Sequence, residues 1–244
     1  VGIYVARRIV RVITPGTLVD PERLDARQAN DLAAIALGGG SPSVACLDLS
    51  TGEFVSVRLD GTPAAELLAR RPVRELVAFP SEREEVARLL EGLGSEAPVL
   101  SVLPSESPRG RSAADLLEGH FRTSTLAGFG LPASGPAVEA AAAVLAYARG
   151  TQKADCAHVT SLRSESAAGG LVVDAVTQGH LELFRSLRDG GRNGTLLSVV
   201  DRTGTPFGAR ALRRVLEQPL GGIDAIEARL DAVEELVGDP SRLE

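Results

Sequence analysis

Short apolar runs separated by turn residues fill roughly the first hundred positions of the chain. Residues 44–49 are mostly apolar, and residues 53–59 alternate between apolar and polar side chains. A period of two is typical of a half-buried strand, so we expect two strands joined by a tight turn at residues 50–52. One face of the second strand would carry Val55, Val57 and Leu59, and the opposite face Ser56 and Arg58.

Helix signals follow this expected hairpin. Thr62 and Pro63 predict the start of a helix over residues 64–70. Ser81 and Glu84 have the spacing of a capping box, which predicts another helix behind them. Strands are predicted on either side of that second helix, at residues 73–79 and 98–103.

Residues 31–37 fit two kinds of element. Leu32, Ile35 and Ala36 would share one face of a helix, but the glycines at 38–40 favour a strand that ends in a loop. With a strand here, the order becomes strands, helix, strand, helix and strand. That order is typical of a mixed α/β domain.

The second half of the chain has helical spacing. Breaker-rich residues 104–112 and 128–136 precede it and predict an exposed boundary between two domains. Helices are expected beyond them at residues 138–149, 174–188, 205–218 and 223–237. Asp174 would cap the second of these helices, which would bury Val176, Leu181, Phe184 and Leu187. We therefore expect the second domain to be all-α.

Composition and charge restrict the class of protein. The 244 residues suffice for two modest domains and include no apolar run near the ~18 residues of a membrane span. Cys46 and Cys156 match no metal or redox spacing, which fits a reducing, cytoplasmic compartment. The net charge of −6 argues against a dominant nucleic-acid surface, and Arg7, Arg8 and Arg11 are a weak phosphate-contacting signal. Because the chain starts with valine and contains no methionine, we expect an excised piece.

The residue patterns of common catalytic and metal sites are missing from the sequence. There is no G-x-x-x-x-G-K-[ST] segment, and the glycine clusters at 38–40 and 190–194 lack its lysine, so we expect loops there and no ATP hydrolysis. Cys156 and His158 form a C-x-H pair without further ligands. The histidines, which have no partners at metal-ligand spacing, are His120, His158 and His180.

Asp48 is the most suggestive acidic residue, because an aspartate at the end of a strand resembles the acidic position of RNase H-like nucleases. Such nucleases need several carboxylates to hold two metal ions about 4 Å apart. Glu53 and Glu75 are the other candidates, but nothing in their spacing makes the three converge. We favour the alternative that Asp48 caps the turn that follows it.

Several segments, in this order, resemble MutS mismatch repair proteins. Segments similar to the family's connector domain are residues 10–17 (VRVITPGT), 30–35 (NDLAAI), 46–54 (CLDLSTGEF) and 75–82 (ELVAFPSE). Segments similar to its core domain are residues 145–147 (LAY) with 151–152 (TQ), 173–177 (VDAVT), 181–183 (LEL), 195–203 (TLLSVVDRT) and 229–236 (RLDAVEEL). The resemblance covers nearly the whole chain.

The resemblance implies an RNase H-like α/β connector domain at residues 10–130 and the first part of an all-α core, or lever, domain at residues 131–244. Residues 1–9 would end a preceding mismatch-recognition domain. No catalytic, cofactor-binding or metal-binding residue is implied for this fragment. ATP and Mg would belong to the intact protein, a DNA-dependent ATPase.

The implied role of the fragment is to couple mismatched-DNA binding to the ATPase and to recruitment of MutL. The implied partners are mismatched double-stranded DNA, bound through domains outside this chain, the MutL protein, and a second MutS subunit in a homodimer. The implied location is the cytoplasm, in association with the nucleoid and not with a membrane. Two other classes stay open: a MutS-family adaptor without mismatch repair function, and an RNase H-like nuclease.

Overall fold

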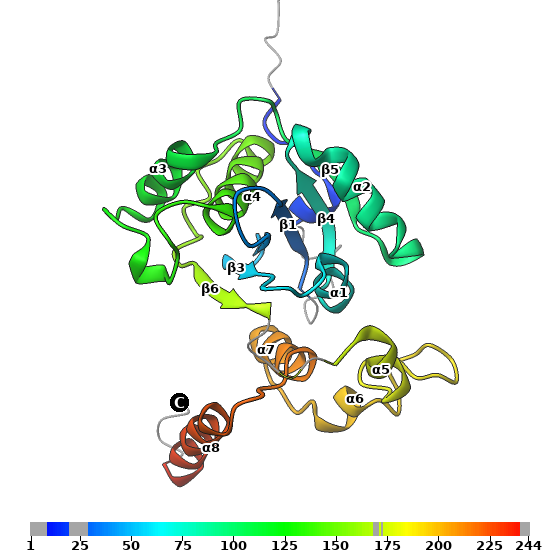
Figure 1. The fold of residues 1–244 in the computed structure, drawn as a ribbon. Helices are drawn as coiled ribbons and strands as arrows, with labels where there is room; N and C mark the ends of the chain where they lie inside the picture. Colours follow the sequence, from blue (N-terminus) through cyan, green and yellow to red (C-terminus); the bar gives the residue numbers. More distant parts are fainter. Residues whose placement is uncertain (1–8, 20–28, 168–170, 172, 240–244) are drawn as a thin grey trace, which may run out of the picture. The chain divides into compact units, whose positions relative to one another are not determined.

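The computed structural model describes residues 9–19, 29–167, 171 and 173–239 (Figure 1). The chain divides into two compact units, Val1–Ala167 and Ala168–Glu244. The first unit contains a six-stranded sheet in the order β5-β4-β1-β2-β3-β6. Its strands are β1 (Asp31–Ala36), β2 (Ser43–Asp48), β3 (Glu53–Arg58), β4 (Val73–Ala78), β5 (Val99–Val102) and β6 (Arg163–Ser166). Its α-helices are α1 (Ala64–Arg70), α2 (Arg83–Glu91), α3 (Gly110–Phe121) and α4 (Pro136–Gln152), and its 3-10 helices are η1 (Pro15–Thr17), η2 (Pro80–Glu82), η3 (Gly94–Glu96) and η4 (Ala127–Phe129).

The sheet is mixed in direction. β1, β2 and β3 form an antiparallel meander, and β4, β5 and β6 join it through parallel pairs. The expected hairpin is confirmed, and so is a strand within residues 31–37. The meander register places Asp48 opposite both Asp31 and Glu53.

Helices cover both faces of the sheet (Figure 1). Ala33 and Ile35 of β1 share a core cluster with α1 and α2, while Leu32 and Ala34 share another with α3 and α4. A strand that is buried on both faces has no polar side to alternate with its apolar side. This explains why residues 31–37 lack the period of two.

Helix α4 packs closely on the sheet because its sheet-facing side chains are small. Ala140 and Ala141 are fully buried, and the Ser56 hydroxyl, also fully buried, donates a hydrogen bond of 2.9 Å to the Ala137 carbonyl. Ser56 was expected on the polar face of a half-buried strand. The structure differs because α4 covers that face.

The first unit extends beyond residue 130, the end of the connector domain that the resemblance implies. Helix α3 occupies part of the breaker-rich segment, and Leu117, Leu126 and Leu131 are buried in the core. Helix α4 contributes to that same core, and β6 pairs in parallel with β3. The contact boundary therefore lies at residues 167/168 rather than 130/131.

One predicted helix start is also corrected. Helix α2 begins at Arg83 after the 3-10 helix η2, and no side chain caps it. The Ser81 hydroxyl instead accepts a hydrogen bond of 3.4 Å from the Arg109 guanidinium. The expected Ser81–Glu84 capping box is therefore not formed.

The second unit is helical in its described residues. Its helices are α5 (Ala175–His180), α6 (Leu196–Val200), α7 (Pro206–Glu217) and α8 (Ile223–Gly238). Asp174 caps α5 as expected, accepting a hydrogen bond from the Thr177 amide. The helix ends far short of residue 188, because Glu182 adopts a left-handed φ of 47° that a helix cannot continue through.

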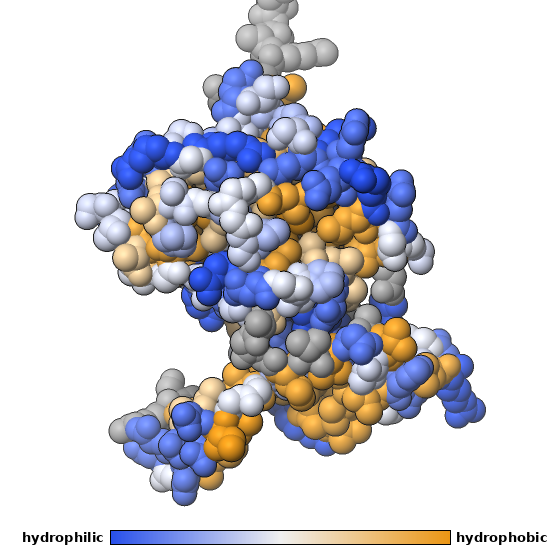
Figure 2. All heavy atoms as spheres, viewed as in Figure 1, coloured by the Kyte–Doolittle hydropathy of each residue, from blue (hydrophilic) through white to orange (hydrophobic). Residues whose placement is uncertain are grey.

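Many apolar side chains of the second unit are exposed. Three of the four side chains expected to be buried there are exposed: Val176, within α5, at 66%, and Leu181 and Leu187, beyond its end, at 58% and 68%. Apolar residues also gather on the surface over α6 and α7 (Figure 2), and α8 buries none of its residues. Within the described chain, no helix combines the length and hydropathy needed to cross a bilayer.

Candidate functional site

Asp48, the leading acidic candidate, is part of a turn. Its Oδ1 accepts hydrogen bonds from the Ser50 amide at 2.8 Å and from the Ser50 hydroxyl at 2.6 Å. This geometry is that of an aspartate capping the turn that follows it. The turn-capping interpretation is therefore confirmed.

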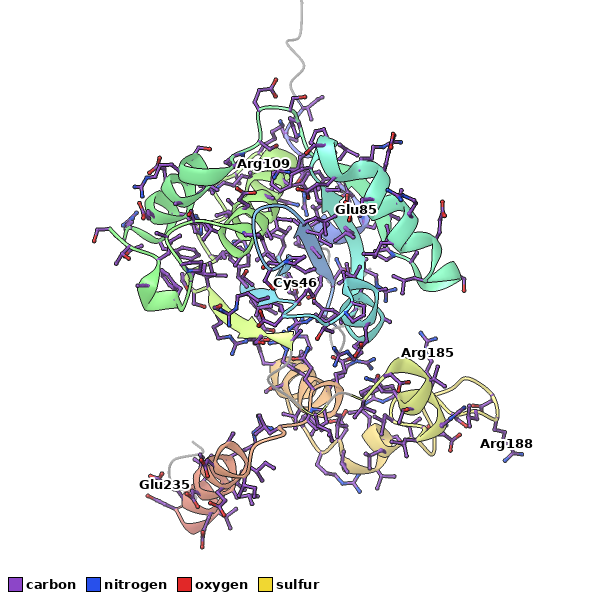
Figure 3. The ribbon with its side chains drawn as sticks, in the orientation of Figure 1. Cys46, Glu85, Arg109, Arg185, Arg188 and Glu235 are labelled. Carbon is purple, nitrogen blue, oxygen red and sulfur yellow. The ribbon has the colours of Figure 1, made fainter. Side chains whose placement is uncertain are left out.

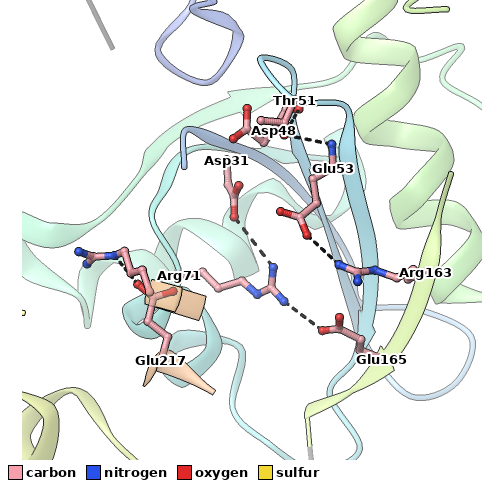
Figure 4. A network of polar contacts seen from close by, with 9 residues as sticks. Asp31, Asp48, Thr51, Glu53, Arg71, Arg163, Glu165 and Glu217 are labelled. Carbon is pink, nitrogen blue, oxygen red and sulfur yellow. Dashed lines mark hydrogen bonds and ion pairs between the residues drawn. The ribbon is translucent and has the colours of Figure 1, made fainter. Parts of the chain in front are cut away.

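The carboxylates opposite Asp48 pair with arginines (Figure 4). Asp31 lies 4.0 Å from the Arg71 guanidinium, and Glu53 lies 2.7 Å from that of Arg163. Arg71 is itself buried and also contacts Glu165 at 3.1 Å. In the part of the chain that the structure describes, no group of three His, Cys, Asp or Glu residues is arranged to hold a metal ion.

Glu75 is a separate, fully buried carboxylate. Its Oε1 accepts hydrogen bonds from the Ser101 hydroxyl at 2.6 Å and the Tyr147 hydroxyl at 2.7 Å. Its Oε2 accepts one from the Gly16 amide at 3.0 Å and another from the Thr14 hydroxyl. Burial raises the pKa of Tyr147 above 10.0, which keeps its hydroxyl protonated as a donor. Glu75 thus joins β4, β5, α4 and the segment that precedes the sheet.

Arg109 connects the starts of three helices. Its guanidinium lies 3.6 Å from the centre of the Phe79 ring, 2.7 Å from Glu82 and 3.1 Å from Glu139. The adjacent Gly110 amide also donates to Glu139, at 2.9 Å. Nothing in the sequence pattern predicts this site, because an arginine among breaker residues carries no spacing signal.

Two of the three histidines, His120 and His158, contact backbone carbonyls. The His120 Nε2 lies 2.7 Å from the Val159 carbonyl, and the His158 Nε2 lies 3.0 Å from the Leu49 carbonyl. Burial raises the pKa of the Cys156 thiol, which disfavours the thiolate that would bind a metal. Cys46 and Cys156 are both buried and do not form a disulfide.

Arg11 and the glycine candidates lie in described segments outside the sheet. Arg7 and Arg8 lie outside the described residues, and Arg11 donates a hydrogen bond of 3.3 Å to the Thr17 carbonyl. The glycine clusters at 38–40 and 190–194 are in loops, as expected. Figure 3 shows Arg185 and Arg188 extending outward from the residues that follow α5.

Two family models match the chain, and each falls within one unit. The model described as MutS domain II matches residues 30–162, and the model described as MutS domain III matches residues 176–244. The match to domain II continues past residue 130 through α4, in agreement with the contacts of that helix.

Curated relatives match along nearly the whole chain. The DNA mismatch repair protein MutS of Myxococcus xanthus is 43% identical over 237 residues, which cover 96% of this chain and 26% of that protein. The proteins of that name from Symbiobacterium thermophilum and Methanothrix thermoacetophila are 41% and 36% identical, over 97% and 96% of this chain. They are covered to 27% and 25% of their length, so the chain spans about a quarter of the relatives that it matches.

Proposed function

The chain belongs to the MutS family of DNA mismatch repair proteins, and on this premise we propose that its two units are the coupling parts of a longer repair protein. The first unit would be the connector domain and the second the beginning of the core, or lever, domain. In the intact protein they connect binding of mismatched DNA to ATP hydrolysis and to recruitment of MutL. The observation that carries this proposal is the separate match of each unit to its own MutS domain model.

An RNase H-like fold for the first unit is supported by its topology. An antiparallel meander of β1, β2 and β3 is followed by the parallel strands β4 and β5, which the chain reaches through helices. In this proposal the unit keeps the fold but serves as a non-catalytic module.

The surroundings of the acidic side chains support a role without catalysis. Asp48 uses Oδ1 to cap its own turn, and Asp31 and Glu53 face arginines. A two-metal hydrolytic centre requires carboxylates directed at shared ions instead. ATP and Mg are therefore assigned to parts of the intact protein outside this chain.

The proposed partners follow from the family. They are mismatched double-stranded DNA, MutL and a second MutS subunit, in the cytoplasm and in association with the nucleoid. The net charge of −6 supports only weak, salt-sensitive DNA contact by this chain itself. Discrimination between matched and mismatched duplexes belongs to the domains outside it.

Titration of the full chain with the cognate MutL, followed by hydrogen exchange, tests the proposal. We expect a dissociation constant of roughly 1 to 100 μM, about 5.5 to 8 kcal/mol, with protection confined to residues 30–162. An unrelated acidic protein of similar size serves as the control for nonspecific protection. Protection confined to residues 176–239 would contradict the assignment of the docking role.

A nuclease assay separates the proposal from its enzymatic alternative. The chain is incubated with duplex and single-stranded DNA and Mg²⁺, beside a buffer blank, and we expect no cleavage. Mg²⁺-dependent cleavage that is abolished by Asp48→Asn would establish the nuclease function instead.

A further inference from the structure

The segment that precedes the sheet, residues 9–19, is here called the strap. Its leading apolar side chains bury little surface, since Ile9, Val10, Val12 and Ile13 are between 40% and 74% exposed. Apolar burial therefore contributes little to holding this part of the strap in place. Polar contacts must therefore provide most of the free energy that holds the strap in place.

The two oxygens of the Glu75 carboxylate face different partners. Oε1 is held by Ser101 and Tyr147, which belong to β5 and α4. Among the described residues, Oε2 accepts hydrogen bonds from the strap only, through the Thr14 hydroxyl and the Gly16 amide. One side of the carboxylate is thus fixed to the body of the unit while the other side holds the strap.

Gly16 fits so closely that a side chain has no room there. A Cβ at this position would lie 2.9 Å from the Glu75 Cβ and 2.9 Å from the Leu32 Cδ1. Both atoms belong to the buried sheet and cannot move away cheaply. The absence of a side chain allows the Gly16 amide to reach the carboxylate.

Further hydrogen bonds fix both sides of this contact. The Val12 amide donates to the Thr151 carbonyl at 2.7 Å, and the Gln152 side chain donates to the Thr17 carbonyl at 2.9 Å. The Asn30 side chain donates to the Pro15 carbonyl at 3.0 Å. The strap is therefore bound along its length, with Glu75 at the most deeply buried point.

We propose that Glu75 is the latch of a two-state strap, so that residues 9–17 open and close as one unit. A half-open strap would withdraw some hydrogen-bond donors from a carboxylate that is still buried, which is unfavourable. Half-open states of the strap are therefore depleted. Closed, the strap is a rigid part of the sheet unit. Open, the same residues become a tether. This inference does not depend on the proposed function.

Hydrogen exchange on the full chain tests the latch. In the wild type the amides of Val12, Gly16 and Thr17 should exchange at one common opening rate. Thr14→Val removes a strap hydroxyl at nearly constant shape and should speed all three amides by about tenfold or more. Trypsin should cut the Arg11–Val12 bond of this variant faster by a similar factor.

Two further variants keep the test decisive. Ser56→Ala is the matched control, because it removes a buried hydroxyl hydrogen bond of the same unit far from the strap, and it should leave the strap amides unchanged. Gly16→Ala should release the strap while the β2 amides keep their protection. The proposal is overturned if the exchange rates of the strap amides decrease progressively from Ile9 inward instead of rising together. It is also overturned if Thr14→Val and Gly16→Ala both leave the strap amides as protected as in the wild type.

Discussion

Two arginines of the sheet unit pair with carboxylates in very different surroundings. The Arg71 side chain is 3% exposed and faces Asp31, whose side chain is 5% exposed, whereas the Arg163 and Glu53 side chains are 58% and 34% exposed. Removing one partner of a buried pair leaves a charge that water cannot reach, but exposed pairs contribute little. The burial of a pair, rather than its distance, should therefore set its contribution to stability.

We expect Arg71→Met to lower the free energy of unfolding by about 3–5 kcal/mol. The matched change Arg163→Met should cost less than about 1 kcal/mol, since its charges are solvated and screened. Urea denaturation of both variants measures the difference. Equal losses of unfolding free energy in the two variants would show that burial does not determine what each ion pair contributes.

His120 is held as a neutral ring. Its Nδ1 lies 2.5 Å from the Arg149 guanidinium and its Nε2 faces a carbonyl, so the neutral tautomer with a proton on Nε2 satisfies both contacts. Burial lowers the pKa of His120 below 6.5, against the opposing effect of the hydrogen bond to the Val159 carbonyl, and the Arg149 charge lowers it further. Below pH 6.5 the unfolded chain therefore binds a proton that the folded chain excludes.

The free energy of unfolding should consequently fall as the pH drops from about 7 through 6.5 toward the lower folded pKa of His120. His120→Gln removes the titrating group and should flatten this part of the profile. Urea midpoints at several pH values provide the measurement. Identical slopes for the wild type and the variant would contradict the assigned neutral state.

At the scale of elements, α4 and α8 show how little helical spacing says about burial. Both are long helices, yet Leu145 of α4 is fully buried and Leu230 of α8 is 60% exposed. We expect Leu145→Ala to cost about 2–5 kcal/mol because it opens a cavity against the sheet. Leu230→Ala, the control, should cost less than about 0.5 kcal/mol. Thermal or urea unfolding of the two variants measures the difference. A larger loss of unfolding free energy for Leu230→Ala would contradict the exposed position of α8.

Local pattern predicted most elements of the first unit but not their partners. The strands of the hairpin and the start of α1 follow from period and turn residues, which are local properties. Helix α3 was missed because glycine, proline and serine precede it, and the assignment of α4 to the second domain failed because its packing on β1–β3 is non-local. Glu75 could not be identified as a latch for the same reason: its donors lie at positions 14, 16, 101 and 147.

At the scale of the whole molecule, the two units differ in how well they cover their own apolar residues. The described residues of the second unit bury Leu183, Leu197 and Ala209 but expose many other apolar side chains. Residues 104–136, where the breaker residues predict an exposed boundary between domains, instead contain buried leucines. Local opening is easiest where few apolar contacts hold the chain.

Limited trypsin digestion should therefore cut first after Arg188, in the exposed loop of the second unit, and later after Arg111 or Arg122. Mass spectrometry of the earliest fragments identifies the bond. The three sites share the same protease specificity, so each serves as a control for the others. First cuts within residues 104–136 would restore the boundary expected from the sequence.

The parallel pairing of β6 with β3 also has a consequence for synthesis on the ribosome. Val55 and Arg163 are register partners, so one edge of the sheet stays open until residues made much later emerge. At about 5–20 residues per second, the roughly one hundred intervening residues take on the order of 5 to 20 seconds to add. A translational pause in that interval would prolong exposure of the β3 edge, when a nascent chain is most prone to pair with another copy.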